Sequence, residues 1–203
     1  MKLYTKPGAC SLADHIVLRW IGEPFEVQVM DAKSLKAREY LHINPAGNVP
    51  ALQDGDWLLT QNAAILNYLA ERFPGAGLAG DGTDKGRAET NRWLAFLNAD
   101  VHTSFHPLFG ATGYLDDASA IERSKQHART KLRGLLERID TQLKDKDWLT
   151  GSRSVVDPYL FVILRWANGA AVDLTGLENL ARFFERMSAD PDVVAAMAAE
   201  GLQ

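Results

Sequence analysis

The sequence predicts an α/β domain at the N-terminus followed by an all-helical domain. Three observations support this prediction. The first eighty residues alternate strand-like and helical patterns, a glycine-rich stretch over residues 74–86 follows, and every later apolar pattern has helical spacing. We therefore expect an α/β domain over residues 1–78, a linker over 79–85 and an all-helical domain over 86–203. A chain of 203 residues is long enough for two small domains.

The first strand and helix follow from local residue patterns. Lys2–Thr5 has strand character, and the Pro7-Gly8 pair closes it. Apolar residues then recur at helical spacing from Leu12 to Ile21, so a helix is predicted that Gly22 ends. Ser11 followed by Asp14 resembles a capping box at the start of this helix.

The remaining elements of the first domain complete the order β-α-β-α-β-β-α. Phe25–Val29 alternates apolar and polar residues, which predicts a second strand, and a weaker helix is expected over Ser34–Ile43. Two short apolar runs flank Asp54-Gly55-Asp56, a pattern typical of a hairpin. A last helix is expected over Gln61–Phe73.

The second domain shows five helical patterns. Two are amphipathic stripes, formed by Trp93, Leu97, Val101, Phe105 and Leu108, and by Ala128, Leu132, Leu135, Leu136, Ile139 and Leu143. Leu160–Trp166 is apolar on nearly every side, so it should be the buried central helix, with Ser154 and Asp157 in position to form a capping box before it. Two shorter helices are expected over Leu177–Met187 and Pro191–Ala199.

Composition and charge exclude several classes of protein. Lys and Arg number 22 against 26 Asp and Glu, a net charge of −4, so no bulk basic surface for nucleic acid is present. The single cysteine, Cys10, excludes an internal disulfide and a cysteine-based zinc site. His15, His42, His106 and His127 have no partners at metal spacing, so we expect structural or surface roles for them and no metal. The longest apolar run, near Tyr159–Leu164, is far short of the ~20 residues of a membrane span, and no signal-peptide pattern opens the chain, so a cytoplasmic protein is expected.

Cys10 is the first candidate for chemistry. It stands just ahead of a predicted helix, and the partial positive charge of a helix N-terminus favours a thiolate over a thiol. Such a thiolate would attack a disulfide or lie beside the sulfur of a thiol ligand. The alternative is that Cys10 is a small buried hydrophobic residue.

Four motifs carry a resemblance to a known family. They are KPGACSL at residues 6–12, NPAGNVPAL at 44–52, TQNAAI at 60–65 and SVVDPYL at 154–160. The element order of the first domain is that of the thioredoxin fold, and the whole chain resembles bacterial glutathione transferases of the beta class. The resemblance implies a thioredoxin-like N-terminal domain that binds glutathione and an all-α domain that carries the second-substrate pocket and the dimer contacts.

The resemblance also implies roles for individual residues. Cys10 would contact glutathione and form a mixed disulfide with it, and Ser11 would either donate to the same sulfur or cap the helix. Val49-Pro50, preceded by Asn48, resembles the Val–cis-Pro pair that bonds to the cysteinyl backbone of glutathione. At a helix start, Gln61 and Asn62 would hold the γ-glutamyl group, with Asn62 doubling as an N-cap.

Further residues follow from the same comparison. Lys36, or else Lys33, would meet the glycyl carboxylate. His102 would either bond to the thiol site, shape the second pocket or be structural. Apolar candidates for that pocket are Phe105, Leu108, Phe109, Tyr114 and Trp166.

The chain departs from the family pattern at several positions. Neutral Gln61 stands where the family usually has an acidic residue, which favours weaker glutathione binding because charge-assisted bonds are about twice as strong as neutral ones. Thr5, Ala95 and Thr103 replace residues that the family often has as Tyr, Asn and Lys. We therefore expect a cytoplasmic, homodimeric detoxification enzyme that conjugates glutathione to a small apolar electrophile. Two alternatives stay open: a glutathione-dependent thiol–disulfide reductase with Cys10 as nucleophile, and a non-catalytic glutathione-fold binding protein.

Overall fold

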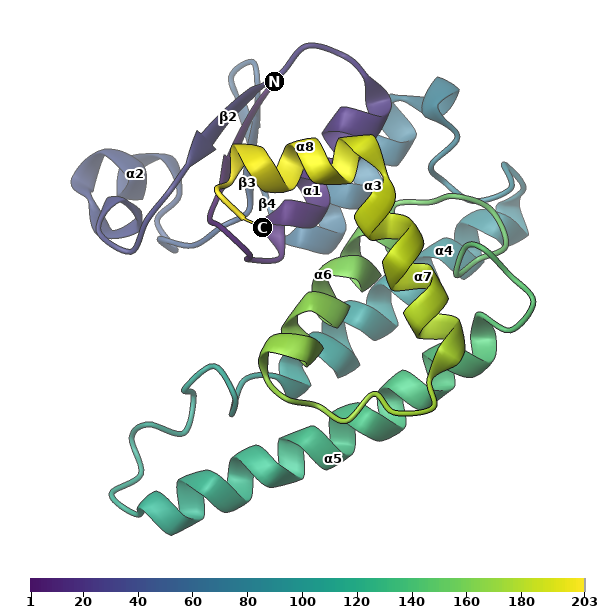
Figure 1. Cartoon of the computed structure of the whole chain (residues 1–203). Coiled ribbons are helices and arrows are strands. Elements are labelled where there is room, and N and C mark those ends of the chain that lie inside the picture. Colours follow the sequence, from purple (N-terminus) through teal and green to yellow (C-terminus); the bar gives the residue numbers. More distant parts are fainter. Residues whose placement is uncertain (203) are drawn as a thin grey trace.

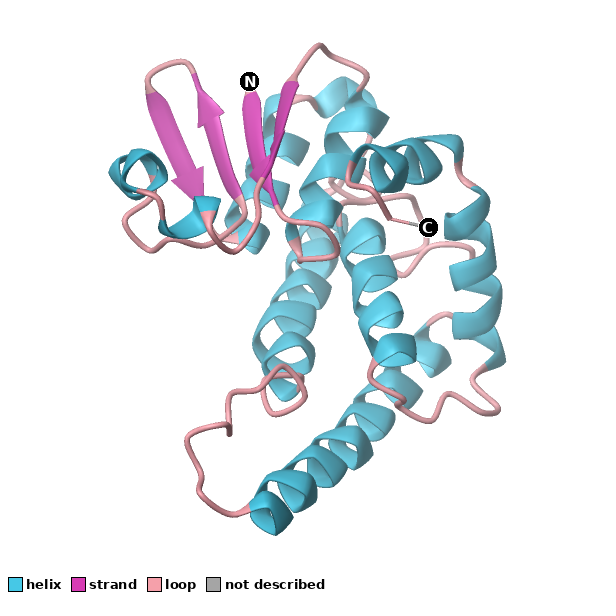
Figure 2. Cartoon of the chain, turned by 60° about the vertical axis from the view of Figure 1, so that its left-hand side comes forward, coloured by secondary structure: helices cyan, strands magenta, loops and turns pink. Residues whose placement is uncertain are grey.

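The computed structural model describes residues 1–202 and has a four-stranded mixed sheet beside a layered set of helices (Figures 1 and 2). The strand order is β2-β1-β3-β4, in which β1 pairs with β2 in parallel and with β3 antiparallel, and β3 pairs antiparallel with β4. The elements of this half are β1 (Lys2–Thr5), α1 (Ser11–Ile21), β2 (Glu26–Val29), η1 (Ser34–Lys36), α2 (Arg38–Ile43), β3 (Ala51–Asp54), β4 (Trp57–Thr60), α3 (Asn62–Arg72) and η2 (Pro74–Ala76). This is the thioredoxin-like arrangement that the sequence predicts.

The two faces of the sheet pack against different helices. Leu3 and Leu52 belong to the main core with the buried faces of α1 and α3. Tyr4 points to the opposite face, as expected from strand alternation, and forms a small cluster with Met30, Tyr40 and Ala51 under α2. Helix α2 covers this second face together with η1, whose Leu35 packs on the same cluster, and α2 stands at the side of the molecule away from the other helices (Figure 1).

Two local predictions in this half are wrong. Ser11 and Asp14 form no capping box, because the N-cap of α1 is Cys10, without a side-chain cap bond, and the Ser11 hydroxyl is used elsewhere. The single helix predicted over Ser34–Ile43 is divided at Ala37, whose ψ of 143° is extended and separates η1 from α2.

The helical half surrounds α6. Its elements are α4 (Asp84–Ala95), η3 (Phe96–His102), α5 (Ala118–Gln142), α6 (Val156–Gly169), α7 (Glu178–Ala189) and α8 (Pro191–Ala199). All α6 residues from Val156 to Leu164 are buried, which confirms the prediction of a buried central helix. The C-terminal helix α8 returns to the first half and packs against α1, whereas one end of the long α5 extends away from the core (Figure 1).

The stripe predicted from Trp93 to Leu108 is not one regular helix. The chain is α-helical to Ala95, widens to a π-helix over η3, is helical again at Thr103 and Ser104, and continues from Phe105 in turns. π-helical segments occur frequently at functional sites. No helix within residues 1–202 is long and apolar enough to cross a membrane.

The start of α6 contains the predicted capping carboxylate. Asp157 is fully buried, and its carboxylate accepts from the Ser154 amide (2.8 Å), the Ser154 hydroxyl (3.1 Å) and the Leu149 amide (3.0 Å). The second hydrogen bond of the predicted capping box, from a backbone amide to the Ser154 hydroxyl, is not formed by Asp157. The Asp157 amide donates to the Ser154 carbonyl instead. Burial raises the pKa of Asp157 to about 6 despite these three bonds, which lower it.

Candidate active site

A cavity of about 360 Å³ lies between the sheet half and η3. Its lining residues are Cys10, Asn48, Val49, Pro50, Gln61, Asn62, Asn98, His102 and His106. Of the residues predicted to bind glutathione, all lie in this set except Ser11 and Lys36; Lys36 is exposed on η1 and outside the lining, as is Lys33. The apolar residues predicted for the second pocket also lie outside this set. The volume is within the usual range for a small-molecule site.

The loop before β3 forms one wall of the cavity. The Val49–Pro50 peptide is cis, as predicted. The carbonyl of Asn48 is held by the Tyr40 hydroxyl (2.6 Å) and by Nδ2 of Asn44 (2.9 Å). Within residues 1–202, neither the amide nor the carbonyl of Val49 has a hydrogen-bond partner. This half-buried strand-like backbone is therefore free to pair with an extended ligand.

Cys10 lies where the loop after β1 becomes α1, and it is half-buried. Burial, followed by the nearby carboxyl of Asp14, raises the pKa of the Cys10 thiol to about 12. The expectation that the helix start favours a thiolate is therefore overturned, because desolvation outweighs the helix dipole and the bonds from backbone amides. Without a ligand, Cys10 is a neutral thiol at physiological pH.

The start of α3 forms the second wall. Gln61 is exposed and has a positive φ of 76°, a conformation that non-glycine residues adopt rarely. Asn62 is not the predicted N-cap: it is the first residue of α3 and is buried. With its amide oriented to satisfy both groups, Nδ2 donates to Asp14 Oδ2 (2.9 Å) and to the Cys10 carbonyl (3.1 Å). Asn62 therefore ties the starts of α1 and α3 together.

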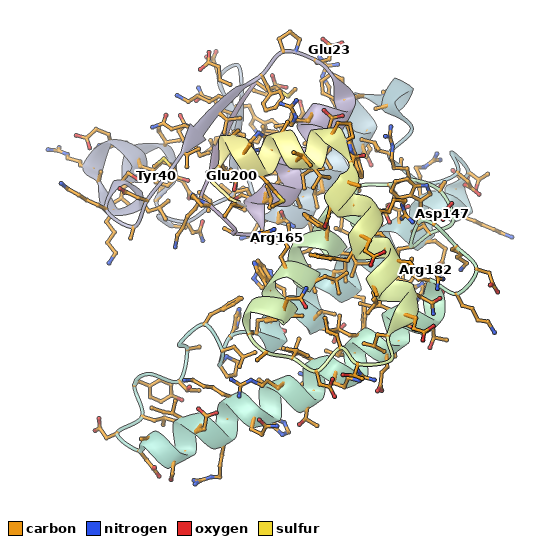
Figure 3. The ribbon with its side chains drawn as sticks, in the orientation of Figure 1. Glu23, Tyr40, Asp147, Arg165, Arg182 and Glu200 are labelled. Carbon is orange, nitrogen blue, oxygen red and sulfur yellow. The ribbon has the colours of Figure 1, made fainter. Side chains whose placement is uncertain are left out.

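A buried polar network lies behind these walls. The Thr5 hydroxyl is 2.8 Å from both Ser11 Oγ and Glu200 Oε1, and His15 Nδ1 is 3.0 Å from the same carboxylate oxygen. Glu200 reaches this position from the C-terminal end of α8 (Figure 3). Ser11 is fully buried and outside the cavity lining, so its hydroxyl supports the strand–helix junction. Glu200 was not foreseen, because nothing in the sequence connects it with residues almost two hundred positions earlier.

Asp14 is the other buried carboxyl in this region. It has no exposed surface, and burial, with a contribution from Glu200, raises its pKa well above the ordinary value of 3.8. The buried carboxyl of Asp14 is therefore protonated more easily than that of an exposed aspartate.

Three nitrogen-bearing side chains form the wall from the helical half. Asn98, His102 and His106 follow one another at intervals of four residues, and all three line the cavity. His106 is exposed, in agreement with the predicted structural or surface role, and it also lines the cavity. Burial, together with the neighbouring His106, lowers the pKa of His102 to about 4, so its imidazole is neutral at physiological pH.

Aromatic rings pack next to His102. The Trp166 ring lies 4.7 Å from that of His102 and 5.3 Å from that of Phe109, and its Nε1 donates to the Gly8 carbonyl (2.7 Å). Of the apolar residues predicted for a second pocket, Phe105 is fully buried and belongs to the core. Phe109 is 53% exposed and Tyr114 79%, so both are accessible to a ligand.

These features define a class of protein. The site has a free backbone segment at a cis proline, a cysteine at the start of one helix and a second helix start that can accept an anion. Together they form a thioredoxin-like site for a peptide thiol. The helical half closes this site with imidazole and indole groups. No cluster of His, Cys, Asp or Glu within residues 1–202 is arranged to hold a metal ion.

Comparison with known proteins gives the family. Residues 1–71 match the model for "Glutathione S-transferase, N-terminal domain" and residues 87–191 that for the C-terminal domain. A glutathione S-transferase of Xanthomonas campestris is 60% identical over 203 residues, with both chains covered completely. The chain also superimposes on a glutathione S-transferase from Xylella fastidiosa (58% identity, TM-score 0.97, 100% and 99% of the two chains) and on a beta-class enzyme from Sphingomonas chungbukensis (38%, 0.86, both chains complete). The chain belongs to the glutathione S-transferase family, as an enzyme that uses glutathione.

Proposed function

We propose that the enzyme conjugates glutathione to small apolar electrophiles, with glutathione lying along the cavity that Cys10, Val49 and Gln61 line. The observation that carries this proposal is the convergence of the three binding elements on one cavity. The free Val49 backbone pairs with the cysteinyl unit, and the start of α3 receives the γ-glutamyl group. Lys36 remains the proposed partner of the glycyl carboxylate, which requires the η1 segment to contribute from outside the cavity lining.

The protonation states favour conjugation over disulfide reduction. Cys10 with a pKa of about 12 is a thiol and a poor nucleophile, so the attacking sulfur is that of glutathione. The amides at the start of α1 and the imidazole of His102 stabilise the glutathione thiolate. That sulfur forms a bond to the electrophilic carbon, and the leaving group departs with its electron pair.

The second substrate occupies the side of the cavity next to the aromatic rings. Phe109 and Trp166 offer adjacent ring surfaces at right angles, with centroids 5.3 Å apart. A flat apolar electrophile packs against such surfaces without leaving buried polar groups unpaired. Aryl halides such as a chloronitrobenzene match this chemistry.

The proposed assembly is a cytoplasmic homodimer formed through the outer face of α4 and η3. Ala88, Ala95 and Ala99 lie exposed along this face, and small side chains allow two helices to approach closely. A two-fold interface brings the same patch of both subunits together. An Ala95→Trp substitution would therefore clash with its counterpart and shift sedimentation toward a monomer, whereas Ala198→Trp, on exposed α8, would not. A wild-type chain that sediments as a monomer at micromolar concentration excludes this interface.

Cys10→Ala tests the assignment of the nucleophile. We expect conjugation of a chloronitrobenzene to fall only a few-fold, because the α1 amides and His102 remain in place. Turnover of a glutathione mixed disulfide, which requires the cysteine sulfur itself, should be abolished. An equal loss of both activities would instead make Cys10 the nucleophile of both reactions and overturn the proposed division.

A further inference from the structure

The hydroxyl of Tyr159 lies directly behind His102. Tyr159 is on α6 and is fully buried, and its Oη is 2.6 Å from Nδ1 of His102. The same oxygen is 3.3 Å from Oδ1 of Asn98, one turn earlier on η3. The two hydrogen bonds differ in length by enough to locate the proton.

The hydroxyl proton lies on the short contact. A separation of 2.6 Å is below the usual 2.7–3.2 Å range of an N–H donor to oxygen but fits a hydroxyl donor. The 3.3 Å contact to Asn98 is beyond the usual 2.5–3.0 Å range of a hydroxyl–oxygen bond. Burial also raises the pKa of Tyr159, so the phenol keeps its proton. Tyr159 therefore donates to Nδ1, and Nδ1 carries a lone pair.

The position of this lone pair determines the rest of the imidazole. A neutral imidazole has one N–H, so an acceptor at Nδ1 places the hydrogen on Nε2. No residue among 1–202 forms a hydrogen bond with Nε2 of His102, and the ring lines the cavity. The Nε2–H group is thus the donor that His102 offers to a ligand.

We propose that Tyr159 is a positioning residue that locks His102 in the Nε2–H tautomer, so that Nε2–H donates to the sulfur of bound glutathione. The proposal rests on the proposed function, in which that sulfur lies beside His102. A donor already in place strengthens as negative charge develops on the sulfur, and no group has to reorient during the reaction. The proton that leaves the glutathione thiol goes to solvent, and the Tyr159 and His102 protons stay where they are.

Three titratable groups face the imidazole from the surrounding elements. They are Tyr159 of α6, His106 just beyond η3, with its ring centroid 6.0 Å away, and Cys10 at the start of α1. Only Tyr159 has a hydrogen bond to the ring among the described residues. Removing its hydroxyl therefore changes the tautomer lock without removing a charge.

The test compares Tyr159→Phe with a matched control, Tyr4→Phe. Tyr4 is also a buried tyrosine, but its hydroxyl bonds to Gln53 on the far face of the sheet. Nitrogen-15 NMR of the ligand-free enzyme should show unprotonated Nδ1 and protonated Nε2 at His102 in the wild type and in Tyr4→Phe. In Tyr159→Phe, the Nδ1 signal should move and His102 should titrate at a higher pH, because a bond that favours the neutral ring is lost.

Kinetics give a second readout. We expect kcat for a chloronitrobenzene to fall about tenfold in Tyr159→Phe, less than the 10²–10³ for outright removal of an oxyanion-hole donor. KM for glutathione should change little, and the ultraviolet absorbance of bound thiolate should appear at higher pH.

A protonated Nδ1 in the wild type overturns the proposal, as do unchanged His102 signals or unchanged kcat in Tyr159→Phe. A His102→Ala enzyme with undiminished conjugation instead refutes the proposed function of His102, while the NMR result still decides whether the lock exists.

Discussion

Replacing Asp157 by Asn should destabilise the enzyme more at pH 5 than at pH 7.5. Asp157 is fully buried at the start of α6, with a pKa of about 6 against an ordinary 3.8. Three hydrogen bonds favour its ionised form and burial disfavours it, and burial prevails. Because the folded-state pKa is raised, the folded protein binds more protons than the unfolded chain in this window. The stability linked to this proton is present below about pH 4 and is lost as the pH rises through 6.

The size of the effect follows from the two pKa values. Their separation corresponds to about 3 kcal/mol over the whole window, of which about 1.4 kcal/mol falls between pH 5 and pH 7.5. The amide side chain of the Asp157→Asn variant does not ionise, so the cost of the substitution should be larger at pH 5 by this difference.

Urea unfolding followed by the fluorescence of the five tryptophans measures this difference, at fixed protein concentration because the assembly contributes to stability. Asp56→Asn, at an exposed position in the hairpin turn, is the control for the change of one charge. A cost that is equal at both pH values, or larger at pH 7.5, would show that the hydrogen bonds outweigh burial and that the capping carboxylate has an ordinary or lowered pKa.

Three further substitutions test other contacts. Gln61→Glu places a carboxylate on the cavity wall beside the ammonium of glutathione and should tighten binding about fivefold in calorimetry, since a charged hydrogen bond contributes about 1 kcal/mol more than a neutral one; weaker binding would mean that residue 61 faces the glutamyl carboxylate. Trp166→Phe keeps one aromatic ring but loses the bond to the Gly8 carbonyl and part of the indole surface, so unfolding should require at least about 1 kcal/mol less, and no change would make this bond energetically neutral. Glu200→Ala removes the carboxylate next to the Thr5 hydroxyl and His15 and should lower the free energy of unfolding by about 3 kcal/mol. Glu200→Gln retains an acceptor oxygen and should lower it less; equal losses would refute the role of that oxygen.

Much of the fold was predictable because its determinants are local. Strand alternation in β1 accounts for Leu3 and Tyr4 lying on opposite faces, and the apolar character of Leu160–Trp166 predicted the buried central helix. The cavity wall at Val49 and Pro50 was predictable for another reason: a motif identified a family, and the family specifies the cis bond.

The wrong or missing predictions about the site depend on neighbours that only the tertiary structure brings together. The helix start at Cys10 favours a thiolate when considered alone, but the burial of Cys10 and the nearby Asp14 reverse the direction of the pKa shift. The π-helix of η3 has no simple periodic signal, so the cavity positions of Asn98 and His106 were not predicted.

The bond between Thr5 and Glu200 has a consequence for folding during synthesis on the ribosome. The two residues are 195 positions apart, so at ~5–20 residues per second Thr5 is synthesised on the order of 10–40 s before its acceptor. During that interval the first strand and helix exist without the carboxylate that Thr5 and His15 share in the finished enzyme. The buried polar network behind Cys10 is therefore completed only after Glu200 has been synthesised.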